Sequence, residues 1–494
     1  MQQGEHWFAS TCLALVLFSA ACTPPSEPAP EGPPDVMLVV LDTLRADRVS
    51  AYGYDRPTTI QVDQVAAAGV LFETAIAPGS WTYPNHASLF TGEPPWIHGA
   101  RRAASEAAET ASEHALVPSQ GSVTAMRTDL PTLAEKFAKA GYRTVALAAN
   151  PWLSPDIGLT RGFQDIRVFR SDETVVTAAR DEIARDHEKP LFLFVNLMYA
   201  HAPYCDGVGP WSVDQPGLLD QATAPPWARD YLVGDHRHVP GFHLDLRAPG
   251  DDMPGIVHYF RGDLQIPSDG LDTLSGLYDA GVRGADFGFG RILEAWVETS
   301  PNGIIAVTSD HGEALGERRR IGHQASVYPE VLEIPMILAA PGRLPAGRRI
   351  EGPVQLHDLN PTLLDLAGIE STEGSLIPVI ETGRADTKPL LAMAWRNPFW
   401  ARNVGGDFAF DWRYYRRGDE ALIWNRTEGA RSAKLFDLTQ DPGMHDDIAI
   451  AQPDRVAYLV EEASKHFVED AAEHVAEIPA HMSERLEALG YIDH

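Results

Sequence analysis

Cysteine is scarce in this sequence, which has only three in 494 residues, at positions 12, 22 and 205. Two of them lie within the first 22 residues, so a chain processed there keeps Cys205 without a partner inside the folded part. An internal disulfide framework is therefore excluded.

Positive charge is scarce as well. Forty Lys and Arg residues stand against 69 Asp and Glu residues, which gives a net charge of −29 at pH 7. A nucleic-acid partner is not expected, because phosphate backbones bind to basic surfaces. For the same reason, a polyanionic substrate requires a metal ion or a local group of cations that overcomes the field of the whole chain.

The apolar run at the N-terminus, Phe8–Ala21, is too short to cross a bilayer as a helix. It ends at Cys22, and residues 23–34 are rich in proline. This order is typical of a lipoprotein, so we expect residues 1–22 to be a signal peptide with Cys22 lipidated and residues 23–34 to be a linker. We therefore expect the protein to be exported and to be periplasmic or on the cell surface, attached to a membrane through Cys22. Secretion without lipidation is the alternative.

Strand and helix patterns alternate over residues 35–386. The run Val36–Leu41 is apolar throughout, as in a strand buried on both faces of a sheet. Similar runs alternate with helical periodicity, which predicts an α/β fold with a doubly wound, mixed or parallel sheet. The other expected strands are 143–148, 191–196, 303–308 and 334–339, and the expected helices are 59–68, 130–140, 174–187, 276–299 and 356–367.

Two stretches interrupt this alternation. Ala103–Gly121 has little pattern and is expected to be a surface insertion. Cys205–Ser275 is expected to form an active-site loop region with short helices, because long insertions in compact domains usually carry function. After about residue 387 the pattern changes, which predicts a small C-terminal α+β subdomain over residues 387–494. Its expected elements are strands 411–416, 421–424 and 434–438 and a terminal helix from Pro453.

The stretch Ser80–Gly92 predicts a tight turn that leads into a short helix. Thr82 is expected just before the helix, and Pro84 stands at an early position, where a missing N–H costs least. A hydroxyl at Thr82 would point into the field of unpaired backbone N–H groups, which suits a negatively charged oxygen. For an isolated Thr-x-Pro, helix capping is the simpler interpretation.

Potential metal ligands follow several of the expected strands. Asp42 comes directly after the first strand, Asp310 and His311 follow the fourth, and His201 comes shortly after the third. Open α/β sheets place ligands at the carboxyl ends of their strands. Two carboxylates, an imidazole and the Thr82 hydroxyl form a four-ligand set for Zn²⁺ or Mn²⁺. Each residue alone has a structural alternative, such as a helix cap or an Asx-turn. Together they predict a metal that lowers the pKa of the hydroxyl.

The chain resembles the sulfatase family of the alkaline phosphatase superfamily. The resemblance extends from about Asp35 to the C-terminus, where Lys434–Gly443 is similar to the closing strand and Asp-Pro turn of the family. The matching motifs are Val39–Asp47 with Tyr52-Gly53-Tyr54, Thr82-x-Pro84-x-His86 with Leu89–Gly92, His98-Gly99, Gly141–Thr144, His201-x-Pro203-Tyr204, Thr308–Glu313 and Gly322-His323.

The resemblance implies an alkaline-phosphatase-like fold and a metal-dependent ester hydrolase. On the matching motifs, Asp42, Thr82, Asp310 and His311 are the expected ligands of one divalent metal ion. Zn²⁺ or Mn²⁺ is favoured, with Ca²⁺ or Mg²⁺ as alternatives.

Five further residues receive roles from the resemblance. His201 and His323 are candidates for protonating the leaving group and for contacting the oxyanion. His86 and His98 are candidates for positioning, with structural packing as the alternative. Glu313 is expected behind the metal ligands.

Three departures from the sulfatase pattern concern the chemistry. Thr82 stands where sulfatases have a Cys or Ser that becomes formylglycine, and the threonine methyl group prevents formation of that aldehyde. Thr43 replaces a second aspartate, and Asp42-Thr43-x-Arg45-Ala46-Asp47 is similar to a motif of phosphoethanolamine transferases, which use a Thr nucleophile on zinc. Asn150-Pro151-Trp152 stands where the family has Lys-Trp-His, so two sulfate-binding cations are missing.

These departures predict a hydrolase or phosphotransferase that acts on phosphate or phosphonate esters through Thr82. The ester is expected on a small molecule, a glycan or a lipid. Two alternatives stay open: a sulfuric ester hydrolase without formylglycine, and a catalytically degenerate binding lipoprotein.

Overall fold

The computed structural model describes residues 32–102, 123–186, 188–202, 204, 255–266, 268–323, 325–371, 373–385 and 388–467, with 475, 476, 478 and 482 near the C-terminus. The expected signal peptide with Cys22, most of the linker, the insertion at 103–121 and most of the loop region 205–275 lie outside the described residues. Within the described part, no helix combines the length and the apolar character that a membrane crossing requires.

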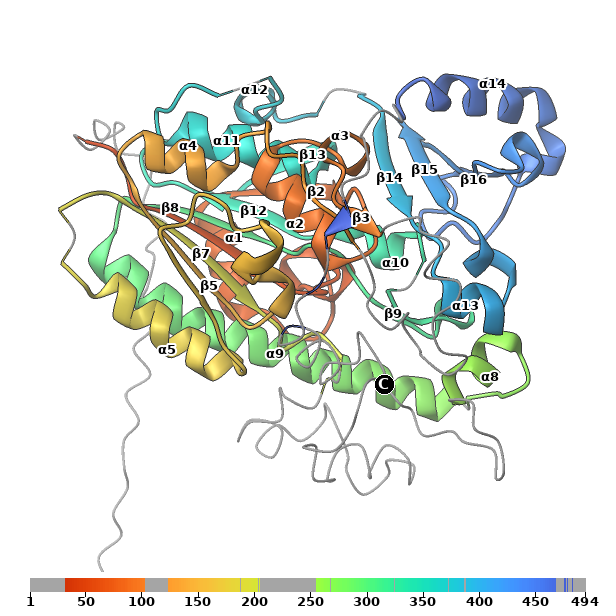
Figure 1. Cartoon of the computed structure of the whole chain (residues 1–494), viewed down its shortest axis with the longest axis horizontal. Helices are drawn as coiled ribbons and strands as arrows, with labels where there is room; N and C mark the ends of the chain where they lie inside the picture. The colour runs from red at the N-terminus through yellow and green to blue at the C-terminus, as the bar shows by residue number, and fades with distance from the viewer. Residues whose placement is uncertain are drawn as a thin grey trace, which may run out of the picture.

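Nine strands of the described chain form one mixed sheet at the centre of the molecule (Figure 1). Strands β1, β5, β6, β7 and β8 pair in parallel, whereas β12 is antiparallel to both of its neighbours. The predicted α/β sheet of mixed type is confirmed. The order is β11 (Glu333–Ile334), β2 (Val70–Ile76), β12 (Met336–Ala339), β8 (Ile304–Thr308), β1 (Val36–Leu41), β7 (Leu191–Leu197), β5 (Arg143–Ala148) and β6 (Asp165–Val168), with β13 (Arg348–Gln355) paired to β2.

Strands β2, β6 and β13 were not expected from the sequence. Polar residues interrupt the apolar pattern in each, and Gly352-Pro353 adds a register shift to β13. Pro335 divides the expected strand 334–339 into β11 and β12. Pairing with neighbouring strands supplies the stability that the local pattern of these segments lacks.

Helices cover both faces of this sheet, as a doubly wound fold requires. Successive side chains of β1 alternate between two cores, with Leu38 in one and Val39 in the other. In Figure 1, α5 and α9 lie on one side of the sheet and α4 and α11 on the other. The first core contains residues of α1 (Ile60–Ala68), α5 (Asp172–Ile183) and α9 (Ser268–Thr299), and the second contains residues of α2 (Thr82–Thr91), α4 (Leu133–Lys139) and α11 (Leu359–Leu366).

Helix α9 begins eight residues before the expected start at 276, inside the region expected to be loop, and α8 (Gly255–Arg261) precedes it. Gly270 and several Asp, Ser and Thr residues weaken the helical pattern of its first turns. Leu274 and Leu277 nevertheless belong to the first core. Packing therefore outweighs the low local propensity.

The described part of the C-terminal subdomain contains an antiparallel sheet and the helices α13 (Pro398–Asn403) and α14, so the predicted α+β architecture is confirmed. The strand β14 was not expected. Apolar side chains of the sheet fill two cores. One is shared with Ile76 and Leu332 of residues 35–386, called the catalytic part below, and the other is shared with the terminal helix. The order is β14 (Leu390–Ala394), β15 (Trp412–Arg417), β16 (Glu420–Asn425) and β17 (Lys434–Asp437), followed by α14 (Pro453–Ser464).

Gly281 of α9 lies against the loop that carries His201. A Cβ atom at this position would overlap with the backbone carbonyl oxygen of Tyr199. We expect Gly281→Ala to lower the melting temperature by about 5 °C, because overpacking against backbone costs about 1–3 kcal/mol.

Gly290→Ala in the same helix is the matched control. Its Cβ would meet the Gln61 side chain, with Cγ at 2.6 Å, so that side chain has to rotate, whereas no backbone atom has to move. Since alanine favours helix over glycine, this variant should melt at the wild-type temperature or above it. Equal melting temperatures in calorimetry for the two variants would contradict the assignment of a tight contact at Gly281.

Candidate active site

The side chains of the candidate site come from the carboxyl ends of neighbouring parallel strands. Asp42 follows β1, Asp310 and His311 follow β8, His201 follows β7, and Asn150 follows β5. Because β8, β1, β7 and β5 are consecutive in the sheet, their ends meet at one edge.

Thr82 reaches this edge from the start of α2, but not as a helix cap. Thr82 was expected just before the helix, but the helix begins one residue earlier, so Thr82 is its first residue. The N-cap is Trp81, whose side chain makes no capping bond. The Thr82 hydroxyl oxygen lies 3.5 Å from Nε2 of His311 and 3.4 Å from Nδ2 of Asn150. The hydroxyl therefore faces the strand ends.

Asp42, Asp310 and His311 are fully buried, and each offers a ligand atom within 4.8 Å of the others. Oδ1 of Asp42 and Oδ2 of Asp310 have no hydrogen-bond partner in the structure. Burying a carboxylate oxygen without a partner is costly, so this pair of oxygens fits a divalent cation. Nδ1 of His311 donates to the Gly312 carbonyl at 2.9 Å, which leaves Nε2 free to bind a metal.

The loop after Asp42 has a strained backbone, and hydrogen bonds to Asp310 and to a buried tyrosine hold it in place. Thr43 has a φ of 59°, which is rare for a residue other than glycine, and its N–H donates to Oδ1 of Asp310 at 3.2 Å. The hydroxyl of Tyr278 on α9 donates to the Thr43 carbonyl at 2.7 Å and accepts from the Arg45 N–H at 2.9 Å. These bonds tie the end of β1 to the end of β8.

Two asparagines that sequence reasoning did not propose as site residues contact Asp42. Nδ2 of Asn150 donates to Oδ2 of Asp42 at 2.8 Å, and Nδ2 of Asn196 donates to the same oxygen at 3.0 Å. One carboxylate oxygen is thus fully used, and the other is left for a ligand. Their positions at the ends of two predicted strands were the available signal.

The ring of His311, a candidate metal ligand, lies next to two further histidine rings. The ring of His323 lies 4.3 Å from that of His311 and 5.5 Å from that of His201, measured between centroids. Nδ1 of His323 lies 3.4 Å from Oε2 of Glu313. Burial lowers the pKa of His323 to about 3, and burial raises the pKa of Glu313 to about 7. The structure therefore brings His201, His323 and Glu313 to the site.

His86 and His98 occupy different places. Nδ1 of His86 donates to the Thr82 carbonyl at 3.0 Å and lies 3.6 Å from Oδ2 of Asp310. Its ring packs edge-on against Phe194, so it lies behind Asp310. Nε2 of His98 bonds to Oγ of Ser88 at 2.9 Å, and burial lowers the pKa of His98 to about 3. The contacts of His98 are those of a packed core residue.

The sulfatase family model matches residues 34–369. The chain belongs to the sulfatase family. It is thus a hydrolase of the alkaline phosphatase superfamily, as the sequence motifs predicted. The family is generally metal-dependent, which agrees with the group formed by Asp42, Asp310 and His311.

Among curated relatives, the Delta 4,5-hexuronate-2-O-sulfatase of Bacteroides thetaiotaomicron is 24% identical over 458 residues, 84% of each chain. Among solved structures, a protein in complex with its substrate D-glucosamine-2-N,6-O-disulfate has a TM-score of 0.64 at 19% identity, over 89% of this chain and 99% of the other. The phosphonate monoester hydrolase of Agrobacterium radiobacter has a TM-score of 0.61 at 19% identity, over 87% and 94%. The two structures share the fold of this chain.

Asn150 should control metal affinity, because it orients Asp42 from outside the ligand set. We expect Asn150→Ala to weaken binding of Zn²⁺ or Mn²⁺ by about 10- to 100-fold in calorimetric titration. Asn302→Ala, on the exposed turn before β8, is the matched control and should bind like the wild type. Unchanged affinity in Asn150→Ala would show that Asp42 needs no such support.

Proposed function

We propose that this chain cleaves phosphate or phosphonate esters with Thr82 as the nucleophile. The observation that carries the proposal is the Thr82 hydroxyl, which faces Nε2 of His311 beside two buried carboxylate oxygens that accept no hydrogen bond from the described residues. Asp42, Asp310, His311 and Thr82 would hold one divalent metal ion, for which Zn²⁺ or Mn²⁺ fits the mixed nitrogen and oxygen ligands. Such an ion supplies a lower pKa for the hydroxyl and a polarised phosphoryl oxygen.

The residue type at position 82 favours phosphorus over sulfur. Threonine carries a methyl group on its carbinol carbon, so it cannot become the aldehyde whose hydrate expels sulfate from a sulfatase intermediate. A threonine phosphate needs no such exit, because water or an acceptor hydroxyl attacks it in line. The fold shared with phosphonate monoester hydrolases supports the same chemistry.

The residues around Thr82 suggest how the protons move. The Thr82 hydroxyl first gives its proton to solvent water, and Oγ1 then bonds to phosphorus while the bond from phosphorus to the leaving oxygen breaks. His201 gives a proton to that oxygen, and the same ring then takes a proton from the water that releases phosphate. Burial lowers the pKa of His323 to about 3 and keeps its ring neutral, so His323 is left to contact the oxyanion. Asn150, with Nδ2 at 3.4 Å from Oγ1, orients the nucleophile.

A sulfuric ester hydrolase without formylglycine is the second candidate. The family model and the hexuronate sulfatase relative favour it. In this case the substrate would be a sulfated glycan, and a metal-activated hydroxyl would replace the aldehyde hydrate.

Substitution of Thr82 tests both the nucleophile and the type of ester. We expect Thr82→Ala to lower kcat for 4-nitrophenyl phosphate or phenylphosphonate esters by a factor of about 10³ or more, since it removes the attacking atom. Thr82→Ser should keep most of the activity, and a chelator should abolish it. The same panel with 4-nitrophenyl sulfate decides between phosphorus and sulfur.

Thr91→Ala is the control for folding, since Thr91 lies in the same helix and its hydroxyl bonds to backbone groups, donating to the Ala87 carbonyl at 2.7 Å and accepting from the Glu93 N–H at 3.2 Å. It should leave the turnover of each ester unchanged. Full turnover of phosphate and phosphonate esters by Thr82→Ala would refute the proposed nucleophile.

A further inference from the structure

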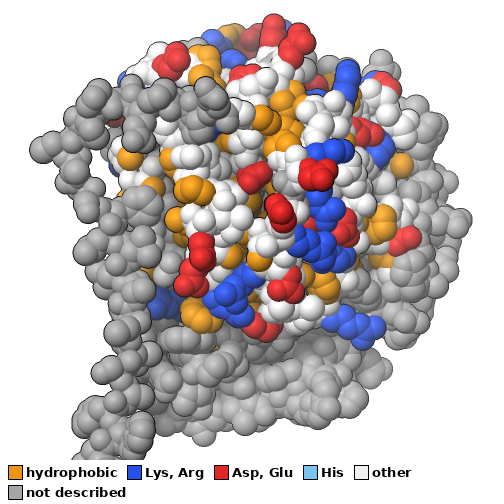
Figure 2. Space-filling view, turned by 90° about the vertical axis from the view of Figure 1, so that its left-hand side faces the viewer, with side chains coloured by type: hydrophobic (Ala, Val, Ile, Leu, Met, Phe, Trp, Pro, Cys, Tyr) orange, Lys and Arg blue, Asp and Glu red, His pale blue; other side chains and the backbone are white. Residues whose placement is uncertain are grey.

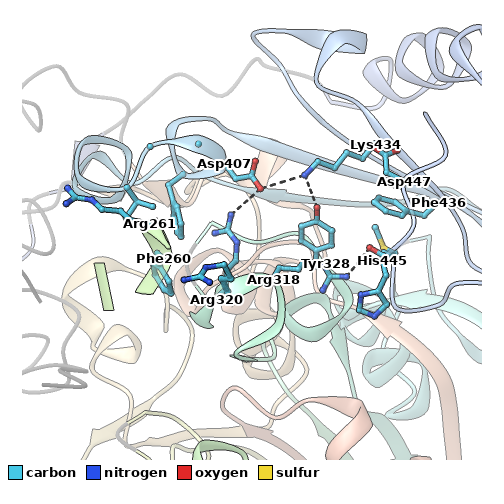
Figure 3. Close-up of a pocket in the computed structure, with 16 residues that line it drawn as sticks. Phe260, Arg261, Arg318, Arg320, Tyr328, Asp407, Lys434, Phe436, His445 and Asp447 are labelled. Atoms are coloured by element: carbon cyan, nitrogen blue, oxygen red, sulfur yellow. Dashed lines mark hydrogen bonds and ion pairs between the residues drawn. The ribbon is translucent and has the colours of Figure 1, made fainter. Parts of the chain in front are cut away.

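A cavity of about 500 Å³ lies between the catalytic part and the C-terminal subdomain, apart from the metal ligands (Figure 3). Positive side chains dominate its lining, in a chain with a net charge of −29. On the face shown in Figure 2, by contrast, acidic and basic side chains are interspersed. The cations of the cavity are Arg261, Arg318, Arg319, Arg320 and Lys434, against two acids, Asp407 and Asp447.

A single hairpin links this cavity to the candidate active site. It consists of β9 (Ala314–Leu315) and β10 (Ile321–Gly322), with Glu313 directly before it and His323 directly after it. The three arginines occupy the loop between the strands. Because three residues of extended chain span at most about 11 Å, the Cα atoms of Arg320 and His323 are no further apart than that. The hairpin therefore places the cavity and the candidate active site next to each other.

The loop is held in a strained conformation that gathers its arginines. Arg318 has a φ of 50° and Arg319 a φ of 56°, two consecutive left-handed residues that are not glycine. Such strain persists only where the surrounding structure supports it, and it is concentrated at functional sites. In an extended chain, successive side chains would point to opposite faces. Here three consecutive arginines line one cavity (Figure 3).

The acids of the cavity do not balance its cations. Nη2 of Arg320 lies 3.4 Å from Oδ2 of Asp407, and Nζ of Lys434 lies 3.7 Å from the same oxygen, so one carboxylate serves two cations. The guanidinium of Arg319 donates to neutral oxygens, those of Gln265, Tyr259 and Leu264. Arg318, in contrast, pairs with Glu330 at 2.7 Å. Among the described residues that line the cavity, the cations therefore outnumber the acids.

Aromatic rings form part of the same wall. Phe260 and Phe408 stack with centroids 5.3 Å apart, and the guanidinium of Arg320 lies 4.1 Å from the centre of the Phe408 ring. Phe408 is buried in this stack, so the partly buried Phe260 is the aromatic surface next to the cations on which a ring that carries an acidic group can pack.

We propose that this cavity binds an acidic sugar of the substrate, next to the sugar that carries the scissile ester. The anion can be a carboxylate, a sulfate or a phosphate, since all three accept charge-assisted hydrogen bonds from Arg and Lys. This inference rests on the proposed function only in placing the reacting ester at Thr82. It also explains how a strongly acidic chain admits a substrate with two anionic groups.

Direct binding tests the proposal without turnover. The probe is the unsaturated heparin disaccharide with three sulfates, titrated calorimetrically into the full chain with Thr82→Ala. We expect Lys434→Gln and Arg319→Gln, each added to this background, to raise Kd about tenfold, as for loss of one charge-assisted bond. The control Arg431→Ala removes an exposed arginine of the C-terminal subdomain outside the cavity and should leave Kd unchanged.

Two further arms identify the anion that is recognised. A carboxyl-reduced disaccharide and one without the 6-sulfate should each be compared on the parent and on Lys434→Gln. The group that the cavity binds is the one whose removal cancels the effect of the substitution. The melting temperature of Lys434→Gln in calorimetry should equal that of the parent, which shows that the variant folds.

The proposal is overturned if Lys434→Gln and Arg319→Gln bind the disaccharide within twofold of the parent, or if Arg431→Ala loses as much affinity as they do. Failure of the proposed function gives a different result. In that case the binding differences persist, while no phosphate or phosphonate ester is turned over in a Thr82-dependent way.

Discussion

Two buried carboxylates that face each other at the edge of the sheet are the constraint around which this protein is built. Asp42 follows β1 and Asp310 follows β8, and each keeps one oxygen that accepts no hydrogen bond from the described residues. Two such groups at short range are compatible with folding only if a cation or strong donors offset their charge. The strained Thr43, the amides of Asn150 and Asn196, and the ring of His86 all act on this pair.

The hairpin after β8 carries further charged residues away from these two carboxylates. Arg45 donates to the Glu313 carbonyl at 2.9 Å and to Oε1 of Glu317 at 2.7 Å, which fixes the hairpin to the loop after β1. Glu313 and His323 lie beside the candidate metal ligands, at the two ends of the hairpin. The tip of the hairpin places Arg318, Arg319 and Arg320 in the cavity of Figure 3, called the basic cavity below. The hairpin thus joins the candidate active site to a cavity where cations outnumber acids, in a chain that is acidic as a whole.

Much of the fold was predictable because its signals are local. The apolar runs that form β1, β5, β7 and β8 are continuous, and the polar residue after each run lies at the carboxyl edge of the sheet. The polar strands β2, β6 and β13 were missed, since partners far along the chain stabilise them. The start of α9 was missed for a related reason, because core packing stabilises a first turn with low helical propensity.

The sequence by itself determined the family, the α/β class and the residues that converge, since Asp42, Thr82, Asp310, His311, His201 and His323 all stand in recognisable motifs at the ends of predicted elements. Only the tertiary structure decided how they are used. It showed that Thr82 is the first helical residue and not a cap, that Asn150 and Asn196 occupy one oxygen of Asp42, and that His98 bonds to Ser88 away from the ligands. The basic cavity, too, depends on tertiary structure. Its residues lie on segments far apart in the chain, and no periodicity in a sequence records which distant side chains share one space.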